Sequence, residues 1–419
     1  MVRYFYTILF YLALPCFFLR LLWRSRHNAQ YRQRWAERLG FCPYRLQNTI
    51  WVHAVSVGET LAAVPLIKAL LARYPQYPLL VTTMTITGAA RVHAALGEQV
   101  KHAYIPYDTP GAVVRFLKRI QPSIAIIMET ELWPNLFSAC QQRGIPIILT
   151  NARLSPKSQA GYQRISTLTR QMLLAIRIIA AQSSADAQRF IELGMPKERI
   201  AVTGNIKFDM EIPADLLARA DTLRVELGQD RLVWIAASTH EGEEAIILAA
   251  HKQIRQNFPH ALLLLVPRHP ERFDTVALLA QQQGYDIVRR SQATPCAMRT
   301  AVYIGDTMGE LLLLYAASDV AFVGGSLIAR GGHNLLEPAM LSKPVLSGPS
   351  LFNFSAISDM LAVTNALTKV HDAQTLADAV QGLFQDPALR QQQGTKAYAV
   401  VEANRGALAK QLACIYPFF

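Results

Sequence analysis

The hydrophobic pattern divides the chain into two series of short apolar runs that are separated by amphipathic stretches. In the first series, between residues 49 and 210, six runs are rich in β-branched residues and almost entirely apolar: TIWVHAVS, PLLVTTMT, VKHAYIP, SIAIIMET, PIILTNAR and IIAAQS. Strands that are buried on both faces have this pattern, and the intervening stretches, such as TLAAVPLIKALLARY, have helical periodicity. Alternation of strand and helix at this spacing predicts a parallel sheet with right-handed crossovers.

A second series of the same kind follows, with the runs LVWIAAS, ALLLLVPR, YDIVRRS, AVYIGD, VAFVGGS and KPVLSG. A polar, helical stretch with a proline separates the two series, and we interpret it as a domain junction. A chain of 419 residues is too long for one ordinary core, so the predicted fold class is α/β with two Rossmann-like domains. The expected boundaries are an N-terminal domain at residues 24–210, a linker at 211–230, a second domain at 231–400 and a C-terminal helix at 401–419.

The N-terminus begins with a long apolar segment. Tyr4 to Leu19 are sixteen residues without a charge, and Arg20 follows them. No small residues suit a signal-peptide cleavage site, and Pro15 directly before Cys16 argues against a lipoprotein signal. We therefore predict a retained membrane anchor at residues 1–23. Because the segment is slightly short and contains a proline, both a spanning and an interfacial helix remain open.

The formal net charge is +12 and the sequence pI is near 9.6, which suggests a nucleic acid, an anionic membrane surface or an acidic substrate as the partner. From Arg20 to Arg45 the chain has seven arginines and one acid, Glu37. These arginines form either a solvated helix face or a basic collar for anionic lipid headgroups. By the positive-inside rule, the large domains then lie in the cytoplasm. The five cysteines are widely spaced without a CxxC pair, which fits a reducing compartment and disfavours a zinc site.

Ligands of doubly wound folds bind at the carboxyl ends of the strands, so the residues directly after each apolar run are site candidates. Glu59, in SVGE, follows the first run. It is either a first-turn acid that the helix dipole stabilises or a catalytic carboxylate. Glu129 and Glu131, in METELWPN, follow the fourth run and are either helix-capping residues or acids that take part in proton transfer. Lys207, in TGNIKFD, is a cation suited to an anionic substrate group.

Two further segments follow strands. NARLSPKS closes the fifth run with Asn151, Arg153, Ser155 and Lys157, which can also form a plain polar loop. ASTHEGEE follows the first run of the second series, and the helix that starts there is a candidate seat for an anion.

The second series contains residues typical of a nucleotide-sugar site. Arg268, in VPRHPERF, can bind a phosphate bidentately, and Gly309 opens a predicted helix. In GGSLIARGGHNLLEP, two Gly-Gly pairs flank a loop, and Asn334 and Glu337 lie one helical turn apart. Glycines allow a phosphate to approach the backbone, and a glutamate in this position can accept hydrogen bonds from ribose hydroxyls.

Several other enzyme classes are disfavoured because their motifs are absent. The chain has no GxxxxGK[ST], no GxGxxG after the first run, no HExxH and no GxSxG. His53, His240, His269 and His333 are scattered, so we expect hydrogen-bonded loop histidines rather than a metal site.

As an ordered set, the segments SVGE, TTMTITG, METELWPN, NARLSPKS, GNIKFD, ASTHEGEE, VPRHPERF, GDTMGEL and GGHNLLEP resemble those of the 3-deoxy-D-manno-octulosonic acid (Kdo) transferases of lipopolysaccharide synthesis. The resemblance extends from the N-terminal anchor to about residue 360. It implies the glycosyltransferase-B architecture, with an acceptor domain, a donor domain and a cleft between them. It also implies CMP-Kdo as the donor and a lipid A precursor, lipid IVA, as the acceptor, at the cytoplasmic face of the bacterial inner membrane.

The same resemblance implies an inverting transfer without a bound metal or cofactor, and anionic membrane lipids but no nucleic acid as partners. By motif, Glu59 is the general base, and Glu129 and Lys207 stabilise the transition state. We expect Glu59 to be ionised at neutral pH because the helix dipole favours its charge. The residues that line the CMP site are Pro267, Arg268, Met308, Gly309, Glu310, Asn334, Leu335, Leu336 and Glu337.

Two alternatives are compatible with the residues. A UDP-sugar transferase or epimerase would have the same fold, and competition by CMP against UDP would distinguish it. A non-catalytic, membrane-anchored binding protein with two lobes would release its sugar nucleotide unchanged.

Overall fold

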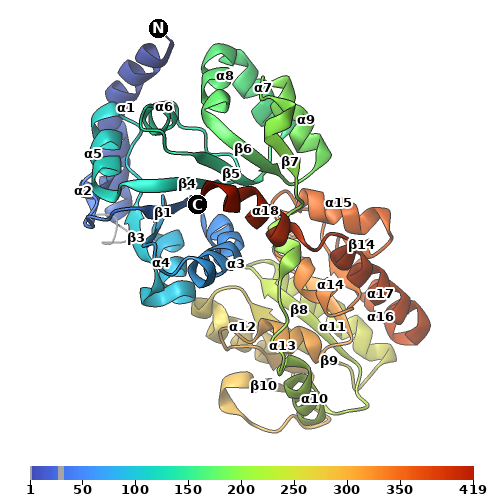
Figure 1. Cartoon of the computed structure of the whole chain (residues 1–419). Coiled ribbons are helices and arrows are strands. Elements are labelled where there is room, and N and C mark those ends of the chain that lie inside the picture. Colours follow the sequence, from blue (N-terminus) through green and yellow to red (C-terminus); the bar gives the residue numbers. More distant parts are fainter. Residues whose placement is uncertain (1, 27–32) are drawn as a thin grey trace. The chain divides into compact units, whose positions relative to one another are not determined.

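The computed structural model describes residues 2–26 and 33–419. Its contacts divide the chain into two compact units (Figure 1). The first unit comprises the chain up to Asp209 together with Arg405–Phe419, and the second comprises Met210–Asn404. Each unit contains one seven-stranded parallel sheet, which confirms the predicted α/β class with two Rossmann-like halves.

The sheet of the first unit has the strand order β3-β2-β1-β4-β5-β6-β7. Its strands are β1 (Thr49–His53), β2 (Leu79–Thr83), β3 (Lys101–Tyr104), β4 (Pro122–Met128), β5 (Ile147–Ala152), β6 (Ile176–Ala181) and β7 (Ile200–Val202). Along β1, Trp51 packs in one core cluster, whereas Ile50 and Val52 pack in another. Successive side chains of a strand point to opposite faces, so both faces of this sheet are buried, as the apolar runs predict.

The helices of the first unit cover these two faces, and the C-terminal segment supplies one of them (Figure 1). In α18, Leu412 and Ile415 join the core cluster, and the Thr150 hydroxyl donates to Gln411 Oε1 over 2.7 Å. The helices are α2 (Trp35–Arg38), α3 (Val57–Arg73), α4 (Ile86–Leu96), α5 (Pro110–Ile120), α6 (Pro134–Gln142), α7 (Pro156–Arg164), α8 (Ser166–Ala175), α9 (Ser184–Glu192) and α18 (Ala407–Ile415), with the 3₁₀ turns η2 (Gly97–Gln99), η3 (Lys197–Arg199), η4 (Ile206–Asp209) and η7 (Tyr416–Phe418).

The sheet of the second unit has the order β10-β11-β9-β8-β12-β13-β14. Its strands are β8 (Val233–Thr239), β9 (Leu262–Pro267), β10 (Ile287–Arg289), β11 (Val302–Ile304), β12 (Val320–Val323), β13 (Val345–Ser347) and β14 (Leu367–Lys369). The sequence analysis missed β14, because this three-residue edge strand is only partly buried and leaves no apolar run. The helices are α10 (Leu216–Leu227), α11 (Glu243–Asn257), α12 (Phe273–Gln282), α13 (Leu311–Ala316), α14 (Leu336–Met340), α15 (Ser355–Val363), α16 (Ala373–Gln385) and α17 (Pro387–Ala403), with η5 (Pro270–Arg272) and η6 (Arg290–Gln292).

The stretch that we expected to be a linker, residues 211–230, contains α10 and lies within the second unit. Leu216, Ala220, Leu223 and Leu227 are buried and pack against β8, β9 and α13. Their spacing forms one narrow apolar stripe on a helix whose other positions are exposed or partly exposed and include several charged residues. The polar composition therefore hides a packed helix.

Both sheets have a topological switch point next to their first strand. In the first unit, β2 and β4 lie on opposite sides of β1. In the second unit, β9 and β12 lie on opposite sides of β8. Ligands of such sheets bind where the strand order reverses, outside the carboxyl ends of the strands. Residues after β1 and β4, and after β8 and β12, are therefore placed to form sites.

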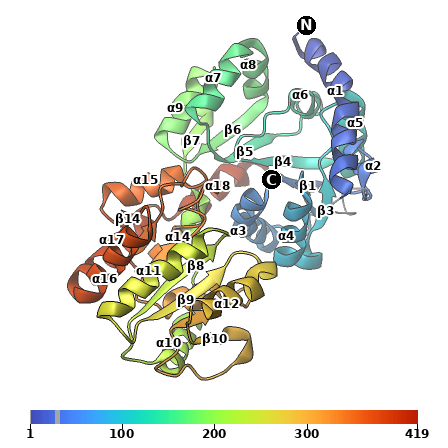
Figure 2. The ribbon, with the colours of Figure 1, turned by 180° about the vertical axis from the view of Figure 1, so that it is seen from behind.

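Helix α1 (Val2–Ser25) lies alongside α5 in both views of the ribbon (Figures 1 and 2). It is long and apolar enough to cross a membrane. Its partly buried positions are 3, 6, 7, 10, 13, 14, 17, 18, 21 and 25, which form one helical stripe. This stripe faces the first unit: Thr7 Oγ1 donates to Asn135 Oδ1 over 3.1 Å, and the Phe17 and Tyr107 rings stack at 5.5 Å. The opposite face exposes large apolar side chains.

Two of the seven arginines that we considered as a lipid collar are structural. Arg34 forms two hydrogen bonds to the Glu37 carboxylate, at 2.6 and 2.9 Å. Arg38 is buried, donates to the Met84 carbonyl oxygen and lies 4.3 Å from the centre of the Tyr104 ring. The collar interpretation is therefore wrong for these two, because their guanidinium groups make their contacts inside the first unit. Arg32 lies outside the described residues.

Candidate active site

Glu59 lies in the first turn of α3, directly after β1. Ser56 is the N-cap, and its hydroxyl accepts a 3.4 Å hydrogen bond from the Glu59 backbone N–H. The Glu59 carboxylate reaches back: Oε2 accepts from the Val55 N–H and Oε1 from the Ser56 hydroxyl, both at 2.8 Å. This is close to a capping box, so Glu59 holds the start of the helix whatever else it does.

The surroundings of Glu59 oppose its charge. The side chain is buried, and this burial raises the pKa of the carboxyl above its ordinary value, with a smaller contribution from the negative charge of Glu129. Hydrogen bonds from Val55 and Ser56 act in the opposite direction. The helix dipole, which we expected to dominate, is thus outweighed by desolvation. A carboxyl whose pKa is shifted toward neutral pH is better suited to accept a proton.

Glu131 completes a group of three carboxyls at the switch point between β1 and β4. Burial, with smaller contributions from the charges of Glu59 and Glu129, raises its pKa to about 7. Burial, together with the negative charge of Glu131, raises the pKa of the Tyr162 hydroxyl to about 12. The structure therefore brings together all three acids that the sequence singled out.

Lys207 reaches this end of the sheet by a return of the chain. Strand β7 is at the edge of the sheet, three positions from β4. After it, the chain turns back, and the Ile206 N–H donates to Asn151 Oδ1, at the end of β5, over 3.1 Å. Ile206 is buried in the same core cluster as Ile148. Lys207 is the next residue and lies in η4. The hydrogen bond of Ile206 to Asn151 therefore holds Lys207 near the carboxyl end of β5.

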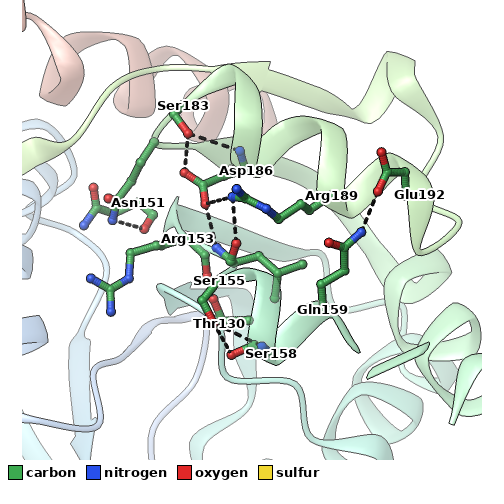
Figure 3. Close-up of polar contacts among 12 residues, drawn as sticks. Thr130, Asn151, Arg153, Ser155, Ser158, Gln159, Ser183, Asp186, Arg189 and Glu192 are labelled. Carbon is green, nitrogen blue, oxygen red and sulfur yellow. Dashed lines mark hydrogen bonds and ion pairs between the residues drawn. The ribbon is translucent and has the colours of Figure 1, made fainter. Parts of the chain in front are cut away.

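The NARLSPKS segment is a set of structural polar contacts (Figure 3). The Thr130 hydroxyl, in the loop that carries the two glutamates, donates to the Arg153 carbonyl oxygen. The Leu154 N–H donates to Asp186 over 2.8 Å, and Asp186 also accepts from Ser183 (Figure 3). These contacts connect the loops after β4, β5 and β6, so they fix the position of Glu129 and Glu131.

In the second unit, Glu243 joins the two sides of the switch point. It lies at the start of α11, after β8, and its side chain is fully buried. Its Oε1 accepts from the N–H groups of Ser326 and Leu327, both at 2.9 Å. Its Oε2 accepts from Gly325 at 2.6 Å and from His240 at 3.1 Å. The sequence analysis did not single out Glu243. Its partners, the backbone N–H groups after the Gly324-Gly325 pair, are about 80 residues away, so no local sequence signal marks this glutamate.

The residues after β9 and β12 come together, as the nucleotide-sugar interpretation requires. Asn334 Nδ2 donates to Glu337 Oε1 over 3.2 Å, so the pair lies one turn apart as predicted. Burial raises the pKa of Glu337 to about 7, and the nearby positive charge of Arg268 offsets part of this rise. Arg268 also lowers the pKa of His333 and His240. Arg268 is thus a shared neighbour of all these groups.

The remaining residues of the predicted CMP set differ in their exposure and in whether their side chains already have hydrogen-bond partners. Pro267 ends β9, and Met308 and Gly309 precede α13, with Met308 58% exposed. The Glu310 carboxylate is occupied by Arg290, with hydrogen bonds of 3.0 and 3.1 Å, and by the Thr307 hydroxyl. The Arg290 hydrogen bonds hold the pKa of Glu310 below its ordinary value.

Leu335 and Leu336 belong to the same predicted set. Their side chains are buried in the second unit, at 0% and 1% exposure. A nucleotide can therefore contact these two residues only through their backbone.

Three of the four histidines that we described as scattered are in fact clustered. His240 Nε2 lies 2.8 Å from His333 Nε2, and the His240 and His269 ring centres are 5.3 Å apart. His53 is separate, fully buried in the first sheet and hydrogen-bonded to Thr82. Among residues 2–26 and 33–419, no group of three or more His, Cys, Asp or Glu side chains is arranged to hold a metal ion.

Comparison with known proteins shows the family of the chain. Residues 33–210 match the family model described as 3-deoxy-D-manno-octulosonic-acid transferase (kdotransferase). The chain is 43% identical over 424 residues to the 3-deoxy-D-manno-octulosonic acid transferase of Haemophilus influenzae, covering 100% of this chain and 99% of that protein. This protein belongs to the Kdo transferase family.

A second Kdo transferase, from Bordetella pertussis, is 40% identical over 382 residues, which is 88% of this chain and 87% of the relative. This Kdo transferase is therefore an enzyme of the glycosyltransferase class. Its fold is also similar to that of UDP-GlcNAc 2-epimerase from Neisseria meningitidis, with a TM-score of 0.56 at 14% identity, covering 88% of this chain and 100% of that one. At this identity the likeness concerns the fold alone, which is the glycosyltransferase-B architecture.

Proposed function

We propose that this Kdo transferase moves Kdo from CMP-Kdo to the lipid A precursor lipid IVA, with inversion and without a bound metal ion, in lipopolysaccharide inner-core synthesis. The observation that carries the proposal is the group of three carboxyls at the switch point of the first unit. A hydroxyl acceptor needs a base, and this group contains two carboxyls with raised pKa values. The first unit is then the acceptor domain and the second the CMP-sugar domain.

In the proposed reaction, a hydroxyl oxygen of the acceptor attacks the anomeric carbon of Kdo as the bond from that carbon to the phosphate oxygen of CMP breaks. The leaving CMP takes the bonding electron pair, and the acceptor proton goes to the Glu59 carboxylate. Attack from the side opposite the leaving group inverts the anomeric centre. Glu59 can receive the proton because each carboxylate oxygen accepts only one hydrogen bond from Val55 or Ser56 and so retains a lone pair.

Charge develops on both reacting groups, and we assign two residues of the first unit to its stabilisation. Glu129 lies close enough to Glu59 to raise its pKa, so it favours the protonated form of Glu59 that the reaction generates. The ammonium of Lys207 favours negative charge on the departing phosphate or on the sugar carboxylate. Neither role requires a metal ion.

The second unit is proposed to bind the CMP part of the donor. Arg268 offers a guanidinium fork to the phosphate. Glu337, which is held by Asn334, offers carboxylate oxygens to the ribose hydroxyls. Gly309 and the backbone of Leu335 and Leu336 complete the contacts, together with Pro267, Met308 and Glu310.

The acceptor is a lipid, and α1 provides the corresponding membrane contact. Its exposed face carries Phe5, Ile8, Leu12, Leu19 and Trp23, which are 59% or more exposed. Because the opposite stripe packs on the first unit, we propose that α1 lies in the cytoplasmic interface of the bacterial inner membrane, with this face in the lipid. The exposed Arg20, Arg24 and Arg26 then meet anionic headgroups.

The test is CMP release from CMP-Kdo, with and without lipid IVA, in the presence of EDTA. We expect release that depends on the acceptor, persists in EDTA and falls about 10²–10⁴-fold in Glu59→Gln. Glu98→Gln, an exposed glutamate in η2, is the matched control and keeps wild-type turnover. Glu131→Gln identifies the base: loss in this variant but not in Glu59→Gln would move the role to Glu131.

Other outcomes contradict the proposal. Release of CMP without an acceptor indicates a hydrolase. Loss of activity in EDTA, restored by a divalent cation, contradicts the metal-independent transfer. Turnover of UDP-sugars in place of CMP-Kdo moves the enzyme to another donor class.

A further inference from the structure

The histidine cluster of the second unit is the feature that the mechanism above does not use. His240 follows β8 and His333 precedes α14, so the two side chains meet across the switch point. Their Nε2 atoms are 2.8 Å apart, and the ring planes differ by only 6°. The backbone approaches them closely: a Cβ at Gly325, where φ is +69°, would lie 2.9 Å from His333 Cδ2. The site thus requires glycine at this position in order to hold the pair.

A hydrogen bond between two Nε2 atoms has a chemical consequence. One ring must donate its Nε2–H and the other must accept, so the neutral pair holds one proton in this bond. The ring that accepts carries its own proton on Nδ1. One additional proton can bind to the Nδ1 atom of the other ring without breaking the bond between the Nε2 atoms, and both Nδ1 atoms are then donors. Neither Nδ1 atom has a hydrogen-bond partner among the residues that the structure describes.

The neighbours of the pair are mainly cationic. His240 is influenced by His269, Arg330, Arg268 and Arg272, and its backbone N–H is held by Glu243. These charges and burial lower the pKa of His240.

His333 has a similar environment. Burial lowers its pKa to about 4, and the charges of Arg268, His240 and His269 contribute. Glu337, four residues further along, is the acidic group that shares Arg268 with the pair. Burial and the positive charge of the neighbouring guanidinium groups therefore favour the neutral form of the pair.

We propose that the His240–His333 pair takes up one proton when the sugar-nucleotide donor binds and then holds an anionic oxygen of the donor through the Nδ1–H groups. This inference rests on the proposed CMP-sugar site of the second unit. An incoming anion neutralises the guanidinium charges that oppose protonation and adds negative charge beside the rings. Both effects favour the imidazolium form. The anionic oxygen belongs either to the phosphate diester or to the sugar carboxylate.

Proton uptake couples donor affinity to pH. If the bound complex holds one more proton than the free enzyme, Kd increases by up to about tenfold for each pH unit between the pKa of the free pair and the pKa of the bound pair. The donor does not titrate in this range, because a phosphate diester and a carboxylate are both ionised near neutral pH. Any uptake near pH 7.5 is therefore on the protein.

The experiment is calorimetric titration of the full-length enzyme with CMP-Kdo at pH 7.5, in buffers of different ionisation enthalpy. We expect the wild type to take up close to one proton per donor bound, and His240→Gln and His333→Gln to take up close to none. In the variants, the pH slope of Kd flattens. His260→Gln, an exposed histidine of the same unit, is the matched control and keeps the wild-type uptake. Cytidine 5′-methyl phosphate, a diester without a carboxylate, and free Kdo show which anionic group is responsible.

The outcomes are distinguishable. Uptake that persists unchanged in both variants overturns the inference and assigns the proton to another group, of which Glu337 is the first candidate. Binding of CMP-Kdo to the wild type without proton uptake also overturns it, while leaving the proposed donor intact. If CMP-Kdo does not bind the wild type at all, the proposed donor and this inference fail together. Thermal unfolding of each variant, compared with that of His260→Gln, separates a lost proton from a lost fold.

Discussion

Glu243→Gln tests whether one buried carboxylate holds the glycine loop of the second unit in place. The substitution conserves size but replaces one acceptor oxygen with an NH₂ group. Four backbone N–H groups converge on this side chain, two on each oxygen: Ser326 and Leu327 on Oε1, and Gly325 and His240 on Oε2. In either orientation, the amide can accept from only one of these two sets, and its own donors face the other.

The magnitude follows from this count. Two N–H groups lose their acceptor, and each costs about 1–3 kcal/mol when it is left unsatisfied in a buried site. The remaining two bonds weaken because their acceptor is no longer charged. We therefore expect Glu243→Gln to lower the free energy of unfolding of the second unit by about 2–6 kcal/mol. Because the loop precedes His333 and Asn334, affinity for CMP is expected to fall as well.

Glu241→Gln is the control, since Glu241 lies two residues away and its side chain is 87% exposed. Its ion pair with Arg272, at 3.6 Å, predicts a change below about 1 kcal/mol. Calorimetric unfolding of both variants gives the difference in stability, and amide exchange at Gly325, Ser326 and Leu327 locates it. If Glu243→Gln is no less stable than Glu241→Gln and these amides remain protected, the argument from four converging N–H groups is refuted.

Two further predictions concern the first unit. Glu131 has a folded-state pKa of about 7, above its ordinary value of 4.5, so between these pH values the native state binds more protons than the unfolded state. Its effect on stability is therefore favourable at low pH and is lost as pH rises, by up to about 3 kcal/mol, and Glu131→Gln should flatten the decline in urea midpoint between pH 5 and 8. A wild-type-like slope in the variant contradicts the assigned pKa. For the membrane surface, Leu12→Asp and Arg26→Gln should weaken binding to anionic vesicles without loss of stability, whereas Arg38→Met should lower the unfolding temperature and leave vesicle binding intact. The reverse pattern would restore Arg38 to the lipid collar.

The apolar runs determine much of the fold because strands buried on both faces must be apolar whatever their partners are. For this reason most strands of the two sheets were predicted by local pattern, and only the short edge strands β7 and β14 match none of the apolar runs. The motifs at strand ends were likewise placed correctly at one edge of a sheet, since all strands are parallel. Composition did not predict that α10 is a packed helix. Its narrow apolar stripe is buried only because β8 and β9 lie beside it in the folded chain.

Strand order is decided only by the tertiary structure, because local periodicity does not specify which strands pair. Glu59 and Glu129 are neighbours because β1 pairs with β4, and that pairing, together with burial, raises the pKa of Glu59 and Glu131. The position of Lys207 likewise depends on the tertiary structure, because the chain returns from β7 and the Ile206 N–H binds Asn151 at the end of β5.

The same distinction applies to single charged and titratable side chains. The sequence by itself determined that Glu59 and His333 follow apolar strands, and that Arg38 belongs to a basic segment. Only the folded chain decided that Arg38 is buried beside Tyr104, that Glu243 binds a loop about 80 residues away, and that His240 and His333 share a hydrogen bond. Burial and charge depend on neighbours that are distant in the sequence, and these neighbours set the protonation of each group.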